Sequence, residues 1–186
     1  MELIKLEKVK DGKYLKNYEL TYLNKVGKEK KYEMVSRSEI KSPEDIGKKS
    51  SGVSIAVTSG EKLLLLREFR MGVNQEIFNL VAGMIEEGES IEECIHRELY
   101  EETGLSVKRI INILPSSFAA VAISDTCTNI AFVEAEGEFS DHTSANEQIK
   151  PKFYTKKEVK QLLETEKFSS RAQVIAYMFA EYPWSE

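Results

Sequence analysis

Residues 83–105 have the sequence GMIEEGESIEECIHRELYEETGL, which decides how the whole chain is interpreted. Ser90 is followed three residues later by Glu93, and such a pair forms a capping box, which marks the first turn of a helix. Gly104 comes just after the last expected turn, where a left-handed residue commonly ends a helix. The spacing therefore predicts a helix over residues 91–103.

Two acidic side chains of this helix fall where an apolar stripe belongs. At about 100° per residue, the stripe consists of Ile91, Cys94, Ile95 and Leu99. Glu98 and Glu102 lie inside the stripe, and because they are four residues apart their charges repel each other. Burying two carboxylates costs free energy unless a cation compensates them. Oxygen ligands alone favour Mg²⁺ or Mn²⁺ over zinc.

The alternative is that both carboxylates project from the edge of the stripe into solvent. The local charge disfavours this alternative, because residues 86–102 contain eight glutamates and Arg97 is the only fixed positive charge among them.

The same stretch resembles the Nudix box, G-x5-E-x7-R-E-U-x-E-E-x-G-U, in which U is an aliphatic residue. Every fixed position is filled, by Gly83, Glu89, Arg97, Glu98, Leu99, Glu101, Glu102, Gly104 and Leu105. The resemblance implies an α+β fold, a Nudix-type α/β/α sandwich that carries the box as a loop–helix–loop. It also implies metal-assisted attack of water on a phosphorus of a nucleoside diphosphate that is linked to another moiety.

The resemblance also implies roles for residues of the box. Glu98 and Glu102 would be the principal ligands of a Mg²⁺ or Mn²⁺ ion. Glu101 would contribute to metal binding and catalysis, and the carbonyl oxygen of Ala82 would join the ligands. Arg97 would orient the glutamates by ion pairing.

Similarity to ADP-ribose pyrophosphatases extends over most of residues 30–180. The segments that carry it are residues 32–37, 66–70, 81–89, 146–149 and 170–176. In that subfamily, N-terminal strands help to form a homodimer, and the active site takes residues from both subunits. The resemblance therefore implies a homodimer that hydrolyses ADP-ribose to AMP and ribose 5-phosphate.

One segment differs from that subfamily, and the identity of the nucleoside diphosphate sugar therefore has an alternative. Its members commonly carry a proline in the loop after the strand that follows the box, whereas this chain has Ala119-Ala120-Val121 there. The alternative is the same chemistry on another nucleoside diphosphate sugar, such as GDP-mannose. A remote alternative is a non-catalytic nucleotide-binding regulator, but that requires a DNA-binding module, and no basic helix-turn-helix follows residue 181.

Three residues outside the box are candidates for substrate binding. Arg70 could hold the pyrophosphate, because a guanidinium forks onto phosphate oxygens; its alternative role is a salt bridge with Glu68 or Glu76. Tyr32 could stack on adenine, with Arg37 helping to clamp the base. The alternative for Tyr32 is a half-buried tyrosine of a strand.

Glu147 is the candidate for the base that activates water. It lies in a polar loop, residues 141–148, and its family counterpart is a glutamate on a mobile loop. A loop carboxylate that approaches only when substrate is bound fits a gated general base. The alternative is a solvated glutamate, and Asp125 is the reserve candidate. His142, in the same loop, is expected to be exposed and without a role.

The rest of the chain predicts a small sheet followed by the main domain. Alternating patterns that include Tyr14, Tyr18, Leu20, Tyr22, Tyr32 and Met34 predict an N-terminal antiparallel β extension, residues 1–45, as a dimerisation element. A Nudix hydrolase domain is expected over residues 46–186. Within it, the patterns predict a hairpin of strands 53–58 and 62–69, an apolar run over 77–82, strands 108–114 and 129–136, and helices over about 155–166 and 169–181.

Composition limits the partners. The net charge is −5, which argues against a nucleic-acid polymer because no basic surplus exists to neutralise phosphates. The longest aliphatic run, residues 63–66, is far too short to span a membrane, and the N-terminus lacks a signal-peptide core. Cys94 and Cys127 form neither a disulfide framework nor a zinc motif. The expectation is a cytoplasmic enzyme acting on a small nucleotide substrate.

Overall fold

The computed structural model describes residues 1–183. The chain divides into two compact units, Met1–Ser51 with Ser116–Thr128, and Gly52–Pro115 with Asn129–Glu186. The expected N-terminal extension, residues 1–45, lies within the first unit, which also takes in residues 46–51 and 116–128. Within residues 1–183, no helix has both the length and the apolar character that a membrane span requires.

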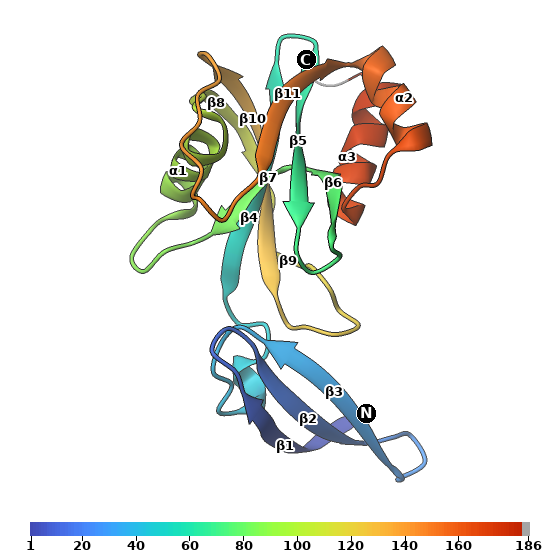
Figure 1. The fold of residues 1–186 in the computed structure, drawn as a ribbon. Coiled ribbons are helices and arrows are strands. Elements are labelled where there is room, and N and C mark those ends of the chain that lie inside the picture. The colour runs from blue at the N-terminus through green and yellow to red at the C-terminus, as the bar shows by residue number, and fades with distance from the viewer. Residues whose placement is uncertain (184–186) are drawn as a thin grey trace. The chain divides into compact units, whose positions relative to one another are not determined.

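The first unit is built on a three-stranded antiparallel sheet (Figure 1). Its strands are β1 (Glu2–Asp11), β2 (Lys16–Leu23) and β3 (Glu29–Ser36), in the order β1-β2-β3, so the predicted antiparallel strands are confirmed. Tyr14 lies in the connection before β2 rather than in a strand. The fully buried Tyr18 anchors a small core, where its hydroxyl oxygen accepts a hydrogen bond of 2.8 Å from the N–H of Ile40. A single-turn helix, Pro43–Asp45, and the two-residue strand β9 (Ser117–Phe118) complete this unit.

The second unit contains the main sheet, whose central order is β11-β5-β4-β10-β8. The strands of the sheet are β4 (Ser50–Ser59), β5 (Lys62–Arg70), β6 (Gln75–Asn79), β7 (Val81–Met84), β8 (Ser106–Ile113), β10 (Cys127–Glu136) and β11 (Ile149–Thr155). The predicted hairpin is confirmed as β4 and β5, which pair at Thr58 with Leu63. The apolar run over residues 77–82 is divided between β6 and β7, because the chain leaves one strand at Leu80 to begin the next.

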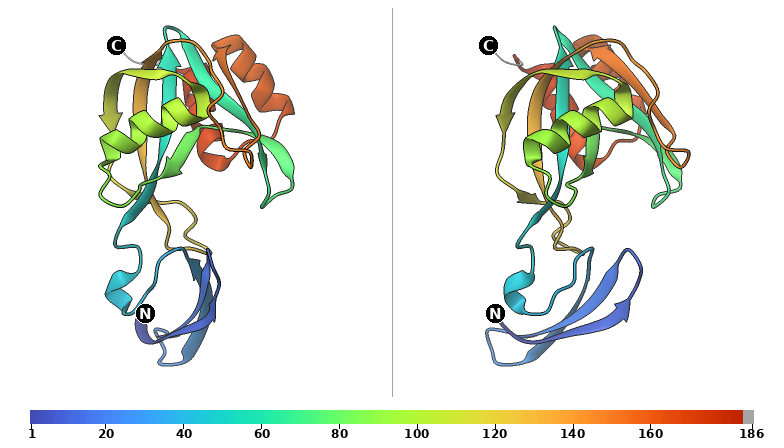
Figure 2. Two further views of the ribbon diagram at one scale, coloured as in Figure 1. Left: turned by 60° about the vertical axis from the view of Figure 1, so that its left-hand side comes forward. Right: turned by 90° about the vertical axis from the view of Figure 1, so that its left-hand side faces the viewer.

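Three helices cover the two faces of this sheet. Helix α1 (Ile91–Thr103) lies on one side, and α2 (Lys156–Thr165) and α3 (Ser170–Glu181) lie on the other (Figures 1 and 2). The predicted caps are present, since Ser90 and Thr155 each begin a capping box and Gly104 ends α1 with a φ of 77°. The predicted α+β class and α/β/α sandwich are confirmed.

Strand β5 shows why both faces of the sheet are covered. Because successive side chains of a strand point to opposite faces, Leu64 and Leu66 pack in the cluster under α1, and Leu63 and Leu65 pack in the cluster under α2 and α3. All four leucines are at most 1% exposed. The aliphatic run thus belongs to a strand between two helical layers.

Strand pairing brings distant segments together at one end of the sheet. Ile149, the first residue of β11, pairs with Glu68 near the end of β5. Ser54 of β4 pairs with Ala82 of β7, the strand that leads into the acidic segment before α1. The end of β5, the middle of β7 and the loop before β11 therefore meet beside α1.

Candidate active site

Glu98 is buried against the strand that precedes its helix. The residue is 9% exposed, while Ile95 and Leu99 on either side of it are fully buried. Gly83 of β7 makes this position accessible to the carboxylate, since a Cβ at Gly83 would lie 1.7 Å from the carboxyl carbon of Glu98. Burial raises the pKa of Glu98, and the neighbouring Arg97 opposes this effect. The solvent-facing alternative for Glu98 is wrong.

Glu102 lies one turn further along α1 and faces the same strand. Its Oε2 accepts a hydrogen bond of 3.2 Å from the N–H of Ala82. Burial raises the pKa of Glu102 well above its usual value, and the carboxylates of Glu68, Glu98 and Glu147 raise it further. Glu68, Glu98 and Glu147 thus add negative charge to the surroundings of Glu102, and a cation bound beside Glu102 would be stabilised by this charge.

Arg97 fixes the acidic side chains on the other flank of the helix. Its Nε and Nη2 donate to the two carboxylate oxygens of Glu89 at 2.7 and 2.8 Å. Its Nη1 donates to Glu98 at 2.7 Å and to Glu101 at 3.1 Å, and its Nη2 also donates to the carbonyl oxygen of Met84 at 2.9 Å. The pairing lowers the pKa of Glu89 to about 2. One guanidinium thus holds Glu89, Glu98 and Glu101 together, and that it orients metal ligands stays a prediction.

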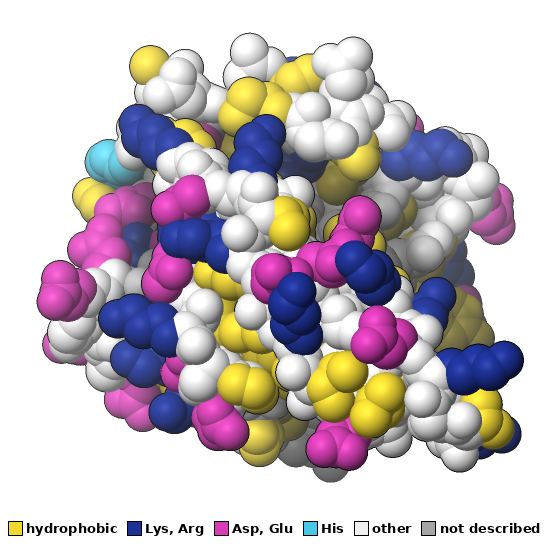
Figure 3. Space-filling view, turned by 90° about the horizontal axis from the view of Figure 1, so that it is seen from below, with side chains coloured by type: hydrophobic (Ala, Val, Ile, Leu, Met, Phe, Trp, Pro, Cys, Tyr) yellow, Lys and Arg dark blue, Asp and Glu magenta, His cyan; other side chains and the backbone are white. Residues whose placement is uncertain are grey.

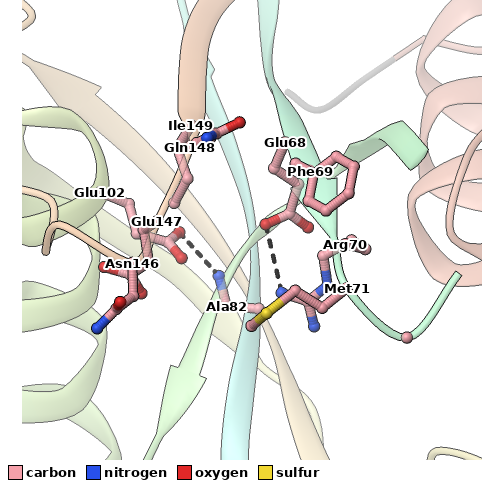
Figure 4. A pocket seen from close by; sticks show the side chains of 11 residues that line it. Glu68, Phe69, Arg70, Met71, Ala82, Glu102, Asn146, Glu147, Gln148 and Ile149 are labelled. Atoms are coloured by element: carbon pink, nitrogen blue, oxygen red, sulfur yellow. Dashed lines mark hydrogen bonds and ion pairs between the residues drawn. The ribbon is translucent and has the colours of Figure 1, made fainter. Parts of the chain in front are cut away.

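A pocket of 290 Å³ opens beside these carboxylates (Figure 4). Glu102 and Ala82 form one wall, Glu68 and Arg70 from the end of β5 form another, and Glu147 comes from the loop before β11. The structure therefore brings together Glu102, Glu147 and Arg70, which the sequence predicted separately. Glu101, in contrast, has a side chain that is 51% exposed and takes part in the Arg97 network.

Glu68, which the sequence suggests only as an ion-pair partner of Arg70, also lines the pocket. The residue is 5% exposed, and its Oε1 accepts a hydrogen bond of 2.6 Å from Nδ2 of Asn79. Asn79 in turn accepts a 2.6 Å bond from the hydroxyl of Ser169, the N-cap of α3. A signal was present in the sequence, because Glu68 continues the inward-facing alternation of Leu64 and Leu66.

Arg70 combines features of both roles considered for it. Its Nη1 lies 3.4 Å from Oε2 of Glu68, which is the expected ion pair. The side chain is nevertheless 57% exposed and borders the pocket, and a guanidinium has five N–H donors. Glu68 therefore leaves most of the donors of Arg70 available to a ligand.

Glu147 is held in a tight turn at the pocket. Its Oε2 accepts a hydrogen bond of 3.0 Å from the N–H of Ser144, and its own N–H donates to the carbonyl oxygen of Ser144 at 3.0 Å. The residue is exposed, which fits both a base that meets substrate and a solvated glutamate, so its role stays a prediction.

Tyr32, Arg37 and Asp125 belong to the first unit. The Tyr32 hydroxyl donates a hydrogen bond to the carbonyl oxygen of Ala122, and the ring borders an apolar groove of 250 Å³. Arg37 is exposed just after β3. Asp125 accepts a hydrogen bond of 3.2 Å from the N–H of Gly47. The roles suggested for these three residues stay predictions.

The donor set fits a hard divalent cation. Across residues 1–183, no three His, Cys, Asp or Glu side chains are already arranged as a complete metal site. The acidic side chains at the pocket offer only oxygen ligands, which Mg²⁺ and Mn²⁺ prefer. Burial raises the pKa of Glu98 and of Glu102, so their charged forms are disfavoured, and a bound cation would offset this effect.

Known families and proteins share sequence with this chain. A model of the NUDIX domain matches residues 48–177. The ADP-sugar pyrophosphatase of Mus musculus is 28% identical over 151 residues, which cover 78% of this chain and 65% of that protein. The ADP-ribose pyrophosphatase of Escherichia coli K12 is 33% identical over 108 residues, which cover 56% of this chain and 52% of that protein. The chain thus spans less than two thirds of the length of either relative.

A solved structure shows the same fold. The crystal structure of an ADP compounds hydrolase superposes with a TM-score of 0.74 over 95% of this chain and 90% of its own, at 22% sequence identity.

Proposed function

Because this chain belongs to the Nudix family, we propose that it hydrolyses the pyrophosphate bond of ADP-ribose, giving AMP and ribose 5-phosphate, with Mg²⁺ or Mn²⁺ as cofactor. One observation supports this function above the others. The pocket combines Glu102, which adjoins the buried Glu98, with a candidate base, Glu147, and a candidate phosphate ligand, Arg70. A diphosphate needs this combination of a metal ligand set, a base and a fixed positive charge.

Glu98 and Glu102 would hold the metal ion, with Glu101 and the carbonyl oxygen of Ala82 completing the protein ligands. When bound, the ion supplies positive charge to the diphosphate and lowers the pKa of the attacking water. Arg97 keeps the carboxylate of Glu98 in place through the 2.7 Å ion pair.

The remaining steps belong to residues of the pocket. Arg70 binds the diphosphate oxygens with the donors that Glu68 leaves available. Glu147 accepts a proton from the attacking water, which requires the loop to bring its carboxylate within hydrogen-bond reach of that water. The oxygen of the water forms a bond to one phosphorus of the diphosphate, and the bond from that phosphorus to the bridging oxygen breaks. The bridging oxygen leaves with the other phosphate, so that AMP and ribose 5-phosphate separate.

The relatives support an ADP-containing substrate, since two of them are named for ADP-sugar and ADP-ribose hydrolysis. Tyr32 would stack on the adenine ring, and Arg37 would help to clamp it. GDP-mannose is the second candidate, because the segment Ala119-Ala120-Val121 lacks the proline that ADP-ribose pyrophosphatases commonly carry.

A small nucleotide suits the surface charge better than a nucleic-acid polymer. The net charge is −5, and acidic and basic side chains are interspersed on the face drawn in Figure 3. Binding along a polymer would instead require a surplus of basic residues on one surface.

We further propose a homodimer that forms through the first unit. This unit exposes apolar side chains that a partner subunit would cover, among them Phe118 at 57%, Val121 at 74% and Ile123 at 62% exposure. Phe118 and Val121 line the apolar groove together with Tyr32. Light scattering of the full chain tests this state, and a monomer at micromolar concentration would contradict it.

A substrate panel tests the proposed reaction. ADP-ribose, GDP-mannose and other nucleoside diphosphate sugars are each incubated with the protein and with Mg²⁺ or Mn²⁺, and nucleoside monophosphate release is measured. We expect the highest kcat/KM with ADP-ribose and none without the metal. Preference for GDP-mannose would reassign the substrate. Tight nucleotide binding without turnover of any compound would favour a regulator instead.

A further inference from the structure

The loop of residues 137–148, which carries Glu147, is attached to helix α1 by an aromatic stack. The imidazole of His142 lies on the ring of Tyr100, with centroids 4.5 Å apart and planes inclined by 21°. The Nε2 of His142 is 2.9 Å from the hydroxyl oxygen of Ser140, so the imidazole is held at its edge as well as on its face. Because Tyr100 is 48% exposed, core burial does not account for this contact.

Ser140 fastens the same end of the loop to the last turn of α1. Its N–H donates a hydrogen bond of 3.0 Å to the carbonyl oxygen of Thr103. The approach is so close that a Cβ at Gly104 would lie 2.0 Å from the hydroxyl oxygen of Ser140. The loop is therefore anchored on the helix that also presents Glu98 and Glu102.

The other end of the loop is fixed to the main sheet. The carbonyl oxygen of Gln148 accepts a hydrogen bond of 3.1 Å from the N–H of Phe69, and β11 begins at the next residue. Only residues 143–147 lie between the two attachments, and they contain the turn that Ser144 closes with Glu147. The position of the Glu147 carboxylate thus depends on both anchors.

We propose that Tyr100 and His142 are positioning residues for Glu147, which hold the loop against α1 so that the carboxylate faces the pocket beside Glu102. This inference rests on the proposed function, in which Glu147 accepts the proton of the attacking water. Loss of the stack releases one anchor, and the carboxylate then samples more positions that are unsuited to proton transfer. The effect falls on kcat, because Arg70 binds the diphosphate from a different element.

Two alanine variants of the full chain, His142→Ala and Tyr100→Ala, remove the stack from either side. His142→Phe keeps a flat ring on Tyr100 and serves as the conservative variant. Matched controls are His96→Ala, an exposed histidine of the same helix, and Tyr177→Ala, a tyrosine of α3 that is 51% exposed.

Two measurements are made on each variant. Hydrogen exchange of the amides of residues 143–148 is followed in the free protein, and steady-state kinetics are followed with ADP-ribose and Mg²⁺. Both alanine variants should exchange faster and lose about 3- to 10-fold in kcat, the effect expected for one ring stack, with KM unchanged. His142→Phe should restore both properties, and the controls should match the wild type. In a Glu147→Gln background, His142→Ala should lower kcat no further.

Several results would overturn the assignment. Unchanged exchange in both alanine variants would show that the stack does not hold the loop. Faster exchange with unchanged kcat would show that the stack has only a structural role. A further loss of kcat when His142→Ala is added to Glu147→Gln would show that the stack does not act through Glu147. If the wild type hydrolyses no compound of the panel, the proposed function fails by itself, and the exchange comparison still decides whether the stack anchors the loop.

Discussion

The carboxylate of Glu98 packs directly against the backbone of Gly83 and leaves no room for a side chain at position 83. A Cβ at Gly83 would lie 1.7 Å from the carboxyl carbon of Glu98 and equally close to its Oε1. The glycine of the box thus serves to admit a buried carboxylate, and the helix and the strand are fitted to each other at this point.

Gly83→Ala should therefore displace the carboxylate of Glu98 without unfolding the protein. A shift of about 1 Å in a catalytic group can cost on the order of 10²-fold in rate, and we expect a loss of that size in kcat/KM. Steady-state kinetics with ADP-ribose, beside circular dichroism to verify folding, measure the effect. Wild-type activity in a folded Gly83→Ala protein would show that the position of Glu98 is unimportant.

Glu102→Gln should stabilise the metal-free protein while strongly lowering its activity. Burial in the folded state, together with nearby carboxylates, raises the pKa of Glu102 well above the ordinary value of 4.5, so this ionisable group destabilises the fold at neutral pH and the penalty vanishes below pH 4.5. The charges that face it are those of Glu68, Glu98 and Glu147. Glutamine carries no charge, so it removes the cost of burying a carboxylate and the repulsion, and it can still accept the hydrogen bond from the N–H of Ala82.

Thermal unfolding in the presence of a chelator measures this effect. We expect the Tm of Glu102→Gln at neutral pH to rise by about 2–4 °C, which corresponds to about 1 kcal/mol for a chain of this size. The difference should disappear as the pH falls below the ordinary pKa of a glutamate. Glu164→Gln, on the exposed side of α2, is the control and should leave the Tm unchanged. A lower Tm for Glu102→Gln at neutral pH would contradict the account.

Arg97→Lys should impair catalysis although it conserves the charge. Lysine cannot donate both hydrogen bonds to the carboxylate of Glu89, at 2.7 and 2.8 Å, while also pairing with Glu98. Residues that orient metal ligands typically contribute about 10- to 100-fold to metal affinity or activity, and we expect a loss in that range. Titration of activity with Mg²⁺ measures it, and an unchanged metal requirement and kcat would refute the orienting role.

Asn79→Ala should weaken substrate binding through Glu68 and Arg70. Glu68 loses its 2.6 Å hydrogen bond from Asn79, and a buried carboxylate left with fewer partners pairs more closely with Arg70, which is then less available to phosphate. We expect a loss of about 1–3 kcal/mol in unfolding free energy and a raised KM for ADP-ribose. Denaturant unfolding measures the free energy of unfolding, and steady-state kinetics measure KM. An unchanged KM would show that Glu68 does not affect substrate binding.

The sequence best predicts those elements whose ends are marked by capping residues close to them in the chain. Helix α1 was predictable at both ends, because Ser90, Glu93 and Gly104 specify its caps through contacts within a few residues. Strand β9 was not predicted, since two residues are too few to show a periodicity, and its pairing of Ser117 and Phe118 with Thr128 and Cys127 is only seen in the folded chain.

The site residues that the sequence predicts best are acidic residues at helix positions where the periodic pattern calls for apolar ones. Glu98 and Glu102 stand out because acids occupy an apolar stripe, whereas Glu68 was overlooked because its ion pair with Arg70 gave it a conventional explanation. The stack of His142 on Tyr100 joins residues 42 positions apart, and only the folded loop brings them together.

Turnover of ADP-ribose by Glu98→Gln and Glu102→Gln, each verified as folded and assayed at saturating Mg²⁺, tests most directly whether these inward-facing carboxylates hold the catalytic metal ion. The predicted result is a loss of kcat on the order of 10³-fold in each variant, comparable to the removal of a principal electrostatic stabiliser. Turnover at the wild-type rate in both variants would contradict the central claim.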